Sequence, residues 1–219
     1  TRMMASTPEV LSELERIVKR DRNHPSIVIW SLANDEYFHQ GTPTGARIIS
    51  SMKRLTKKLD PTRPVTAAMN GSWVPGGISD VVDVQGFNYW NGGLPGAKPR
   101  KPTPGAQLYD TGSPQTCDMD AFHRQFPKLP CIGTEMANGT SVRGIYEADP
   151  ARGFTAPFKV GCLDCTAEPE VWWRVFDERA FLSGGFMWTG FDYRGEPAFD
   201  RICISAQSGA GENFGFPKD

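Results

Sequence analysis

The chain has 219 residues, of which 39% are hydrophobic and 22% are charged, and its formal net charge is -1. This length allows one sizeable domain with a hydrophobic core, and the proportions are ordinary for a globular protein. There is no basic surplus and no apolar run approaches the ~20 residues of a membrane span, so the sequence indicates neither a nucleic acid nor a membrane as a partner.

The amino-terminal part of the chain alternates helix and strand patterns. Ser6-Thr7-Pro8-Glu9 predicts a capping box, and the helix after it is expected to run to about Arg20. The continuously apolar run Ile27–Trp30 predicts a strand buried on both faces of a parallel sheet. A second helix is expected from about Thr44 to Leu59, and a second strand over Pro64–Met69. The residues expected on the apolar helix faces are Val10, Leu14 and Ile17 in the first helix and Ile48, Met52, Leu55 and Leu59 in the second.

The alternation continues, less regularly, to the carboxyl end. Strands are expected over Val81–Tyr89, Pro130–Glu135 and Gly184–Tyr193, and helices over Asp118–Phe126 and Glu168–Leu182. The last of these helices is expected to place three residues on one side: Trp172, Phe176 and Ala180. Residues 91–116 and 136–167 lack periodicity and are expected to form long loops, each after a strand.

This order of elements predicts an α/β protein with parallel strands. The expected strands are too few to close a (β/α)8 barrel. The chain is therefore either an open sheet or the part of a barrel whose first three strands lie upstream of Thr1.

Two further patterns bear on structure rather than on chemistry. The basic run Lys53–Lys58 (KRLTKK) lies in the second expected helix, and we expect it to form a solvated helix face. The five cysteines include the single pair Cys162-Leu-Asp-Cys165, with no second pair and no histidine nearby. A loop disulfide or two reduced thiols therefore fits this pair better than a zinc site.

Carboxylates follow two of the expected strands. Asp35 and Glu36 come after the Ile27–Trp30 run, and Glu135 ends the strand that contains Cys131. A partly desolvated carboxylate is costly unless it is paired or used. Two strand-end carboxylates about 5–5.5 Å apart are what retaining glycoside hydrolysis needs, with one as nucleophile and the other as acid and then base.

Several segments, in this order along the chain, carry a specific resemblance. They are RDRNHPSIVIWSLANDE (Arg20–Glu36), LDPTRPVTAAMNG (Leu59–Gly71), DVQGFNYW (Asp83–Trp90), PCIGTE (Pro130–Glu135), RGIYEAD (Arg143–Asp149) and GGFMWTGFDYRGEP (Gly184–Pro197). Together they resemble glycoside hydrolase family 2, the β-galactosidase and β-glucuronidase family. The resemblance implies that residues 1–219 are the carboxyl-terminal part of the catalytic TIM barrel, strands 4 to 8. Strands 1 to 3 and the preceding β-sandwich domains would then lie outside this chain.

The resemblance also implies roles for individual residues. Glu135 matches the nucleophile, Tyr89 the tyrosine that donates a hydrogen bond to it, Asn34 the asparagine that contacts the sugar 2-hydroxyl, and Trp188 the aromatic platform under the sugar. Asn88, next to Tyr89, is a further candidate for substrate binding.

The sequence departs from the family at the acid/base position. The family has Gly-Asn-Glu there, whereas this chain has Ala33-Asn34-Asp35, so aspartate replaces glutamate. Aspartate is one methylene shorter, and a misplacement of about 1 Å can lower a rate on the order of 10²-fold. Three interpretations stay open: Asp35 is the acid with an adjusted backbone, Glu36 has taken the role although neighbouring strand residues point oppositely, or the site is weakened.

We therefore expect a retaining exo-β-glycosidase, first of all a β-galactosidase. The alternatives are a β-glucuronidase, a β-mannosidase, or an impaired or non-catalytic carbohydrate-binding relative. The expected partner is a carbohydrate substrate, and the mechanism requires no cofactor and no metal. The resemblance is compatible with a homo-oligomer of the full-length protein and with a bacterial-type soluble enzyme of the cytoplasm or the periplasm.

Overall fold

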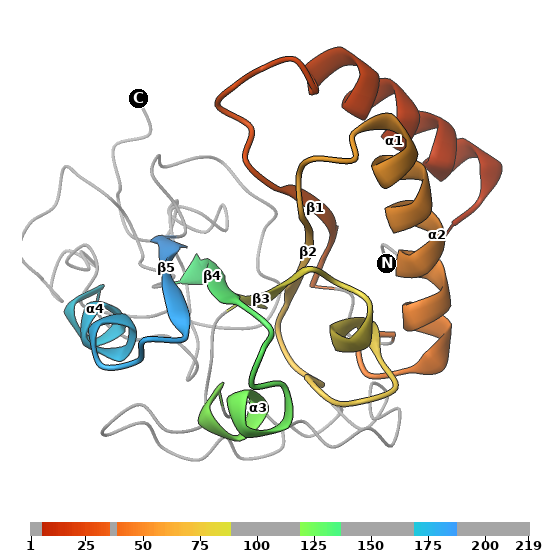
Figure 1. Ribbon diagram of the computed structural model, residues 1–219. Helices are drawn as coiled ribbons and strands as arrows, with labels where there is room; N and C mark the ends of the chain where they lie inside the picture. The colour runs from red at the N-terminus through yellow and green to blue at the C-terminus, as the bar shows by residue number, and fades with distance from the viewer. Residues whose placement is uncertain (1–5, 36–38, 89–118, 137–168, 188–219) are drawn as a thin grey trace, which may run out of the picture. The chain divides into compact units, whose positions relative to one another are not determined.

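Figure 1 shows the computed structural model of the chain, in which residues 6–35, 39–88, 119–136 and 169–187 are described. The chain divides into two compact units. The first comprises Thr1–Asn88 and Lys101–Ile132, and the second comprises Tyr89–Arg100 and Gly133–Asp219. Strand β4 therefore contributes residues to both units.

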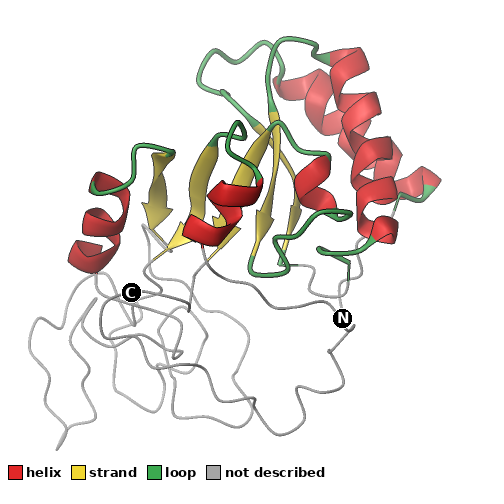
Figure 2. Cartoon of the chain, turned by 60° about the horizontal axis from the view of Figure 1, so that its bottom comes forward, coloured by secondary structure: helices red, strands yellow, loops and turns green. Residues whose placement is uncertain are grey.

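The first unit is a parallel sheet with helices between its strands. In chain order its elements are α1 (Pro8–Asp21), β1 (Trp30–Asn34), α2 (Pro43–Leu59), β2 (Val65–Met69), the 3-10 helix η1 (Ile78–Asp80), β3 (Val84–Asn88), α3 (Met119–Gln125) and the start of β4 (Cys131–Met136). β1 pairs in parallel with β2, and β2 with β3. The Gln85 N–H donates to Pro130 O at 2.8 Å, which places the start of β4 beside β3. The expected alternation of parallel strands and helices is confirmed (Figure 2).

Both long helices begin at a threonine followed by proline. Thr7 caps α1 and its Oγ1 accepts the Val10 N–H at 3.4 Å, so the cap lies one residue after the expected Ser6. The capping box predicted at Ser6 is therefore wrong in register. In α2, Thr42 is the cap and accepts the Gly45 N–H at 3.2 Å. The buried ridge of α2 is Gly45, Ile49, Met52 and Thr56, of which only Met52 was expected.

The first strand begins later than its β-branched residues predict. β1 covers Trp30–Asn34, whereas Ile27, Val28 and Ile29 precede it and Val28 is 70% exposed. The expectation of a strand over Ile27–Trp30 buried on both faces is wrong. At the start of this segment the Ile27 carbonyl is not bonded to a neighbouring strand: it accepts a hydrogen bond from Arg63 Nε at 2.6 Å.

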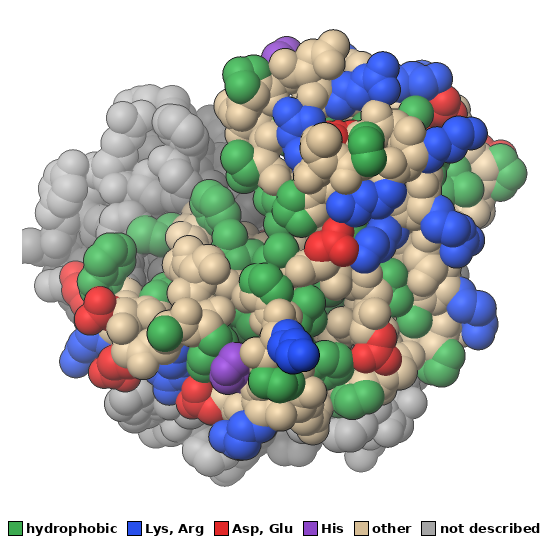
Figure 3. Space-filling view, viewed as in Figure 1, with side chains coloured by type: hydrophobic (Ala, Val, Ile, Leu, Met, Phe, Trp, Pro, Cys, Tyr) green, Lys and Arg blue, Asp and Glu red, His purple; other side chains and the backbone are tan. Residues whose placement is uncertain are grey.

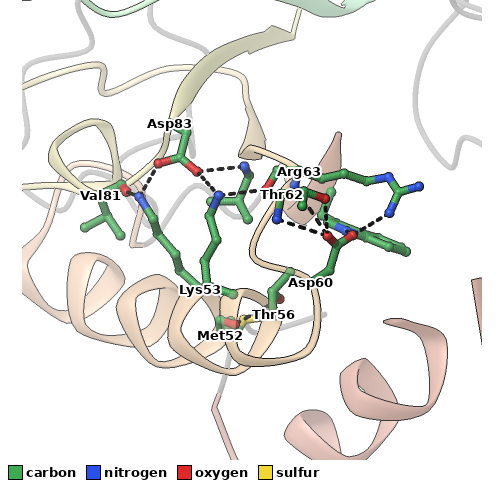
Figure 4. A network of polar contacts seen from close by, with 11 residues as sticks. Met52, Lys53, Thr56, Asp60, Thr62, Arg63, Val81 and Asp83 are labelled. Carbon is green, nitrogen blue, oxygen red and sulfur yellow. Dashed lines mark hydrogen bonds and ion pairs between the residues drawn. The ribbon is translucent and has the colours of Figure 1, made fainter. Parts of the chain in front are cut away.

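That guanidinium belongs to a cluster at the amino end of β1, drawn in Figure 4. Asp60 is 4% exposed, and its carboxylate accepts from the Trp30 indole N–H at 2.9 Å and from Arg63 Nη1 at 2.7 Å. Thr62 Oγ1 donates to the same carboxylate at 2.8 Å. Burial alone would raise the pKa of Asp60, but the hydrogen bonds from Arg63, Trp30 and Thr62 outweigh it and hold that pKa well below its usual range.

A second carboxylate, that of Asp83, forms ion pairs with two partly buried lysines of α2. Lys53 Nζ lies 2.5 Å from Asp83 Oδ1, and Lys57 Nζ lies 3.1 Å from Asp83 Oδ2 (Figure 4). Burial raises the pKa of Asp83, yet the bonds from Lys53, the Val65 N–H and Lys57 lower it overall. The solvated face expected for Lys53–Lys58 is therefore only partly correct. Figure 3 shows Lys and Arg side chains on the surface over α1 and α2, and on α2 the exposed ones are Arg47, Arg54 and Lys58.

Aromatic rings join β3 to α3. The Phe87 ring lies 4.3 Å from the Trp73 ring and 5.4 Å from the Phe122 ring, centroid to centroid. The Trp73 indole N–H donates to Met69 O at 3.1 Å, which also fixes the chain that leaves β2. Since side chains alternate along β3, Phe87 faces these rings while Asn88 faces the opposite side of the sheet.

The second unit contains the rest of β4, helix α4 (Pro169–Asp177) and strand β5 (Leu182–Met187). β4 and β5 are neighbours, and α4 packs against β5. A Cβ on Gly133 or Gly185 would lie 2.6 Å from Phe176 Cζ, so both glycines allow the ring to pack on the strands. The helix ends at Asp177 rather than at Leu182, and Ala180 is exposed beyond its end, contrary to the expected helix face. The strand expected over Gly184–Tyr193 begins two residues earlier, at Leu182. The part of that expected strand after Met187 lies outside the described residues.

Candidate active site

Three of the expected site residues meet at the carboxyl ends of β1 and β3. Asn34 ends β1, Asp35 follows it, and Asn88 ends β3. Asn88 Nδ2 donates to Asn34 Oδ1 at 3.0 Å and to Asp35 Oδ1 at 2.9 Å. Because carboxyl ends of parallel strands lie at the same edge of a sheet, residues far apart in sequence form one polar group here.

The backbone of Asp35 has an uncommon conformation. Its φ is 54°, in the left-handed region, and its N–H donates to Ala68 O of β2 at 3.0 Å. Asp is one of the few residues besides glycine that adopt this region readily, because its short polar side chain bonds locally. The regular strand conformation therefore ends at Asn34, one residue before Asp35.

Asn88 is fully buried, with 0% of its surface exposed. Its amide nitrogen is directed at both Asn34 and Asp35, so its observed contacts are those of a residue that positions its neighbours. Asn34, by contrast, is exposed, and its Oδ1 faces Asn88. The direct contact of Asn88 with substrate stays a prediction.

Glu135 lies in the second unit. It is the next-to-last residue of β4 and is 9% exposed, so the structure places it near the carboxyl end of a strand, as expected. Met136, which follows it, is buried at 1% exposure. A nearly buried carboxylate at a strand end is the kind of group that is used in chemistry or is firmly partnered.

The remaining site candidates lie outside the described residues. Tyr89 directly follows β3, Trp188 directly follows β5, and Glu36 directly follows Asp35. The Cys162/Cys165 pair lies outside them as well. The described cysteine, Cys131, is buried and free, and burial raises the pKa of its thiol to about 12.

The structure adds one residue that the sequence did not indicate. Gln40 is 2% exposed and bonds to Asn70 and Gly71, which follow β2. A single glutamine in an expected loop carries no periodic or motif signal, so only the three-dimensional contacts reveal it.

Neither a metal cluster nor a spanning helix is found in the described segments. Within residues 6–35, 39–88, 119–136 and 169–187, no group of three or more His, Cys, Asp or Glu side chains is placed to hold a metal ion. None of the helices in these ranges is both long and apolar enough to cross a membrane.

Parallel strands joined by helices, with amide and carboxyl side chains at their carboxyl ends, define part of a TIM-barrel domain. Residues 3–93 match the family described as "Glycosyl hydrolases family 2, TIM barrel domain". The chain is 28% identical to a β-galactosidase of Bacteroides ovatus over 94% of this chain and 27% of that protein. It is 37% identical to a β-glucuronidase of Pongo abelii over 86% of this chain and 26% of that protein. Residues 3–93 thus match the TIM-barrel domain of glycoside hydrolase family 2, and the chain as a whole is similar to members of that family.

Solved structures agree on the fold. A β-glucuronidase of Ruminococcus gnavus superposes with a TM-score of 0.62 at 19% identity, over 91% of this chain and 32% of that one. A β-glucuronidase of Dictyoglomus thermophilum gives a TM-score of 0.62 at 21% identity, over 91% of this chain and 31% of that one. The chain thus spans about a quarter of the length of the curated relatives named above and about a third of these two structures.

Proposed function

We propose that the protein containing this chain is a retaining exo-β-glycosidase that hydrolyses terminal β-D-galactosides. The observation that carries the proposal is the group of Asn34, Asp35 and Asn88 at the carboxyl ends of parallel strands, in a chain similar to members of glycoside hydrolase family 2. The similarity to a β-galactosidase of Bacteroides ovatus over nearly the whole chain supports galactose as the first sugar to test.

The proposed reaction has two displacement steps. In the first, the Glu135 carboxylate attacks the anomeric carbon, the bond to the leaving oxygen breaks, and Asp35 gives that oxygen its proton. In the second, Asp35 takes a proton from water, the water oxygen attacks the anomeric carbon, and the bond to Glu135 breaks. Both carboxyl groups return to their starting states, so no cofactor is consumed.

The neighbours of the two carboxylates would hold the sugar. Since Asn34 Oδ1 accepts from Asn88, its Nδ2 is left to donate to the sugar 2-hydroxyl. Following the family resemblance, Tyr89 would donate to Glu135, and Trp188 would stack under the sugar ring.

The acid/base assignment rests on the backbone of Asp35. The left-handed conformation changes the direction in which the side chain leaves the chain, so an aspartate here need not end where a strand residue would. The Asn88 amide supports the Asp35 carboxylate that must accept a proton from water. Glu36 is the alternative acid, and a weakened site is the third possibility.

The test uses the full-length protein and a nitrophenyl β-galactoside. Glu135→Gln should abolish turnover, and activity that survives it would refute the nucleophile assignment. Asp35→Asn should lower turnover at least about 100-fold, whereas Glu36→Gln should change it little. The opposite order would assign the acid to Glu36. A large rise in rate for Asp35→Glu would mean that the natural aspartate impairs the site.

A β-glucuronidase is the second candidate, because the relative from Pongo abelii bears that name and is 37% identical. Such an enzyme needs a cation to bind the sugar carboxylate. Arg100 and Lys101, in the expected loop of residues 91–116, are the basic residues to test for this role, and both lie outside the described residues. The ratio of kcat/KM for nitrophenyl β-galactoside and nitrophenyl β-glucuronide decides between the two. Preference for a β-mannoside would indicate the third sugar, and sugar binding without turnover would indicate a non-catalytic relative.

A further inference from the structure

Gln40 lies in the segment between β1 and α2, and both the oxygen and the nitrogen of its side-chain amide form hydrogen bonds. Its Oε1 accepts the Gly71 N–H at 3.2 Å, and its Nε2 donates to Asn70 Oδ1 at 3.0 Å. Its backbone carbonyl accepts the Ile78 N–H at 2.9 Å. One residue, 2% exposed, therefore joins three segments: its own, the chain after β2, and the start of η1.

The backbone of residues 39–41 is closely packed. A Cβ on Gly77 would lie 2.5 Å from Gln40 O and 2.7 Å from Gly41 Cα. On the other side, a Cβ on Gly45 of α2 would overlap His39 O. Only glycine fits at positions 45 and 77, because a Cβ at either position would overlap this backbone.

The segment also continues directly into α2. Thr42 donates to His39 O from its N–H at 3.1 Å and from its Oγ1 at 3.0 Å. The same Oγ1 accepts the Gly45 N–H as the helix cap. The carboxyl end of the segment is thus attached to a helix of 17 residues.

Asp35 is bonded to the same part of the sheet. Its N–H donates to Ala68 O, and Gln40 bonds to Asn70 and Gly71, so both residues are attached at the carboxyl end of β2. The chain there is itself held in an uncommon conformation, since Ser72 has φ 55° and is 8% exposed. Such backbone strain persists only where surrounding contacts maintain it.

We infer that Gln40 is a positioning residue: it holds the chain that follows β2 through Asn70 and Gly71, and thereby fixes the end of β2, where Ala68 O accepts the Asp35 N–H. Gln40 does not touch the substrate in this assignment. The inference rests on the proposed function for its effect on catalysis, but its effect on the Asp35 backbone is independent of any activity.

The variant Gln40→Met keeps the length of the side chain and removes both hydrogen bonds. Gln85→Met is the matched control, because Gln85 is also fully buried and donates to Gly86 O at 2.8 Å, but on the face of β3 opposite Asn88.

The kinetic measurement compares two leaving groups in the full-length protein. Formation of the glycosyl-enzyme from an alkyl β-galactoside needs the acid, whereas a dinitrophenyl β-galactoside departs without it. In Gln40→Met, kcat/KM for the alkyl substrate should fall on the order of 10- to 100-fold, while the dinitrophenyl value stays within about threefold. Equal losses on both substrates, or no loss, would overturn the inference.

Hydrogen exchange provides the readout that needs no activity. The backbone amides of the peptide containing Asp35 should exchange at least about tenfold faster in Gln40→Met than in the wild type and in Gln85→Met. Unchanged exchange refutes the positioning role even if the enzyme is slowed. If the wild-type protein has no glycosidase activity but exchange accelerates, the proposed function fails while the positioning role of Gln40 stands.

Discussion

The cluster around Asp60 makes a quantitative prediction about stability. Asp60→Asn removes the negative charge that Arg63 Nη1 and the Trp30 indole share, in a site where the carboxylate is 4% exposed. Removing one partner of a buried ion pair costs about 3–5 kcal/mol. An asparagine oxygen still accepts one or two of these hydrogen bonds, and Arg63 retains 18% exposure, so we expect about 3 kcal/mol.

The dependence on pH follows from the lowered pKa of Asp60. A carboxylate whose pKa is lower in the folded state contributes its stability above the unfolded pKa of about 3.9 and loses it as pH falls toward the folded pKa. As the pH falls below this unfolded pKa, the loss of unfolding free energy from this one group should approach about 1.4 kcal/mol per pH unit, and it should amount to about 0.7 kcal/mol at pH 3.5. Asp60→Asn lacks this titrating group, so its stability does not fall for this reason. The difference in unfolding free energy between the wild type and Asp60→Asn should therefore become smaller as the pH is lowered.

Urea denaturation of the full-length protein at pH 7 and at pH 3.5 measures the loss of stability in Asp60→Asn and its dependence on pH. Hydrogen exchange of residues 22–35 provides a local readout. Asp21→Asn is the control, because Asp21 pairs with Arg20 on the exposed surface of α1 and should matter much less. If the two variants are equally stable, or if the gap between Asp60→Asn and the wild type stays constant down to pH 3.5, the assignment of Asp60 as a buried paired carboxylate is wrong.

Three further predictions concern single sites. Gly77→Ala should destabilise the fold by about 1–3 kcal/mol and shift its unfolding midpoint, because the new Cβ meets Gln40 O at 2.5 Å. Cys131, whose thiol pKa is raised to about 12 by burial, should resist iodoacetamide at pH 8 in the native protein and react only after unfolding, as followed by mass spectrometry of its peptide. Asn88→Ala should lower kcat on the order of 10- to 100-fold, because Asp35 loses its amide donor; an unchanged kcat would mean that Asn88 does not position Asp35.

The first residue of β1 was predicted wrongly because contacts distant in the sequence, and not the local sequence pattern, determine it. The β-branched residues before Trp30 predict a strand from their composition alone. In the structure one guanidinium binds three carbonyls of the chain before β1: Arg63 donates to Arg22 O at 2.6 Å, to His24 O at 3.0 Å and to Ile27 O at 2.6 Å. These partners are far apart in the sequence, and no periodicity within residues 22–29 reveals them.

The burial and pairing of residues in a charge run, or of an isolated polar residue, are likewise not predictable from the local sequence. Lys53 and Lys57 lie in a basic run, but both pair with the distant Asp83, and they also donate to Val81 O and Arg63 O. By contrast, the placement of Asn34 and Asp35 beside Asn88 was accessible from the sequence, because parallel strands bring their carboxyl ends to one edge wherever their exact first residues lie. A strand end is thus predicted more reliably than the strand's start when the end carries the polar residues.

The two ends of β1 are held by different contacts. At the amino end, near Trp30, the buried Asp60 carboxylate pairs with Arg63. At the carboxyl end, about 16 Å farther along at ~3.3 Å per residue, Asn88 donates to the Asp35 carboxylate, and the Asp35 N–H donates to Ala68 O. The partners at both ends lie more than 25 residues away in the sequence, so tertiary contacts fix where this strand begins and ends, and the β propensity of its own residues does not.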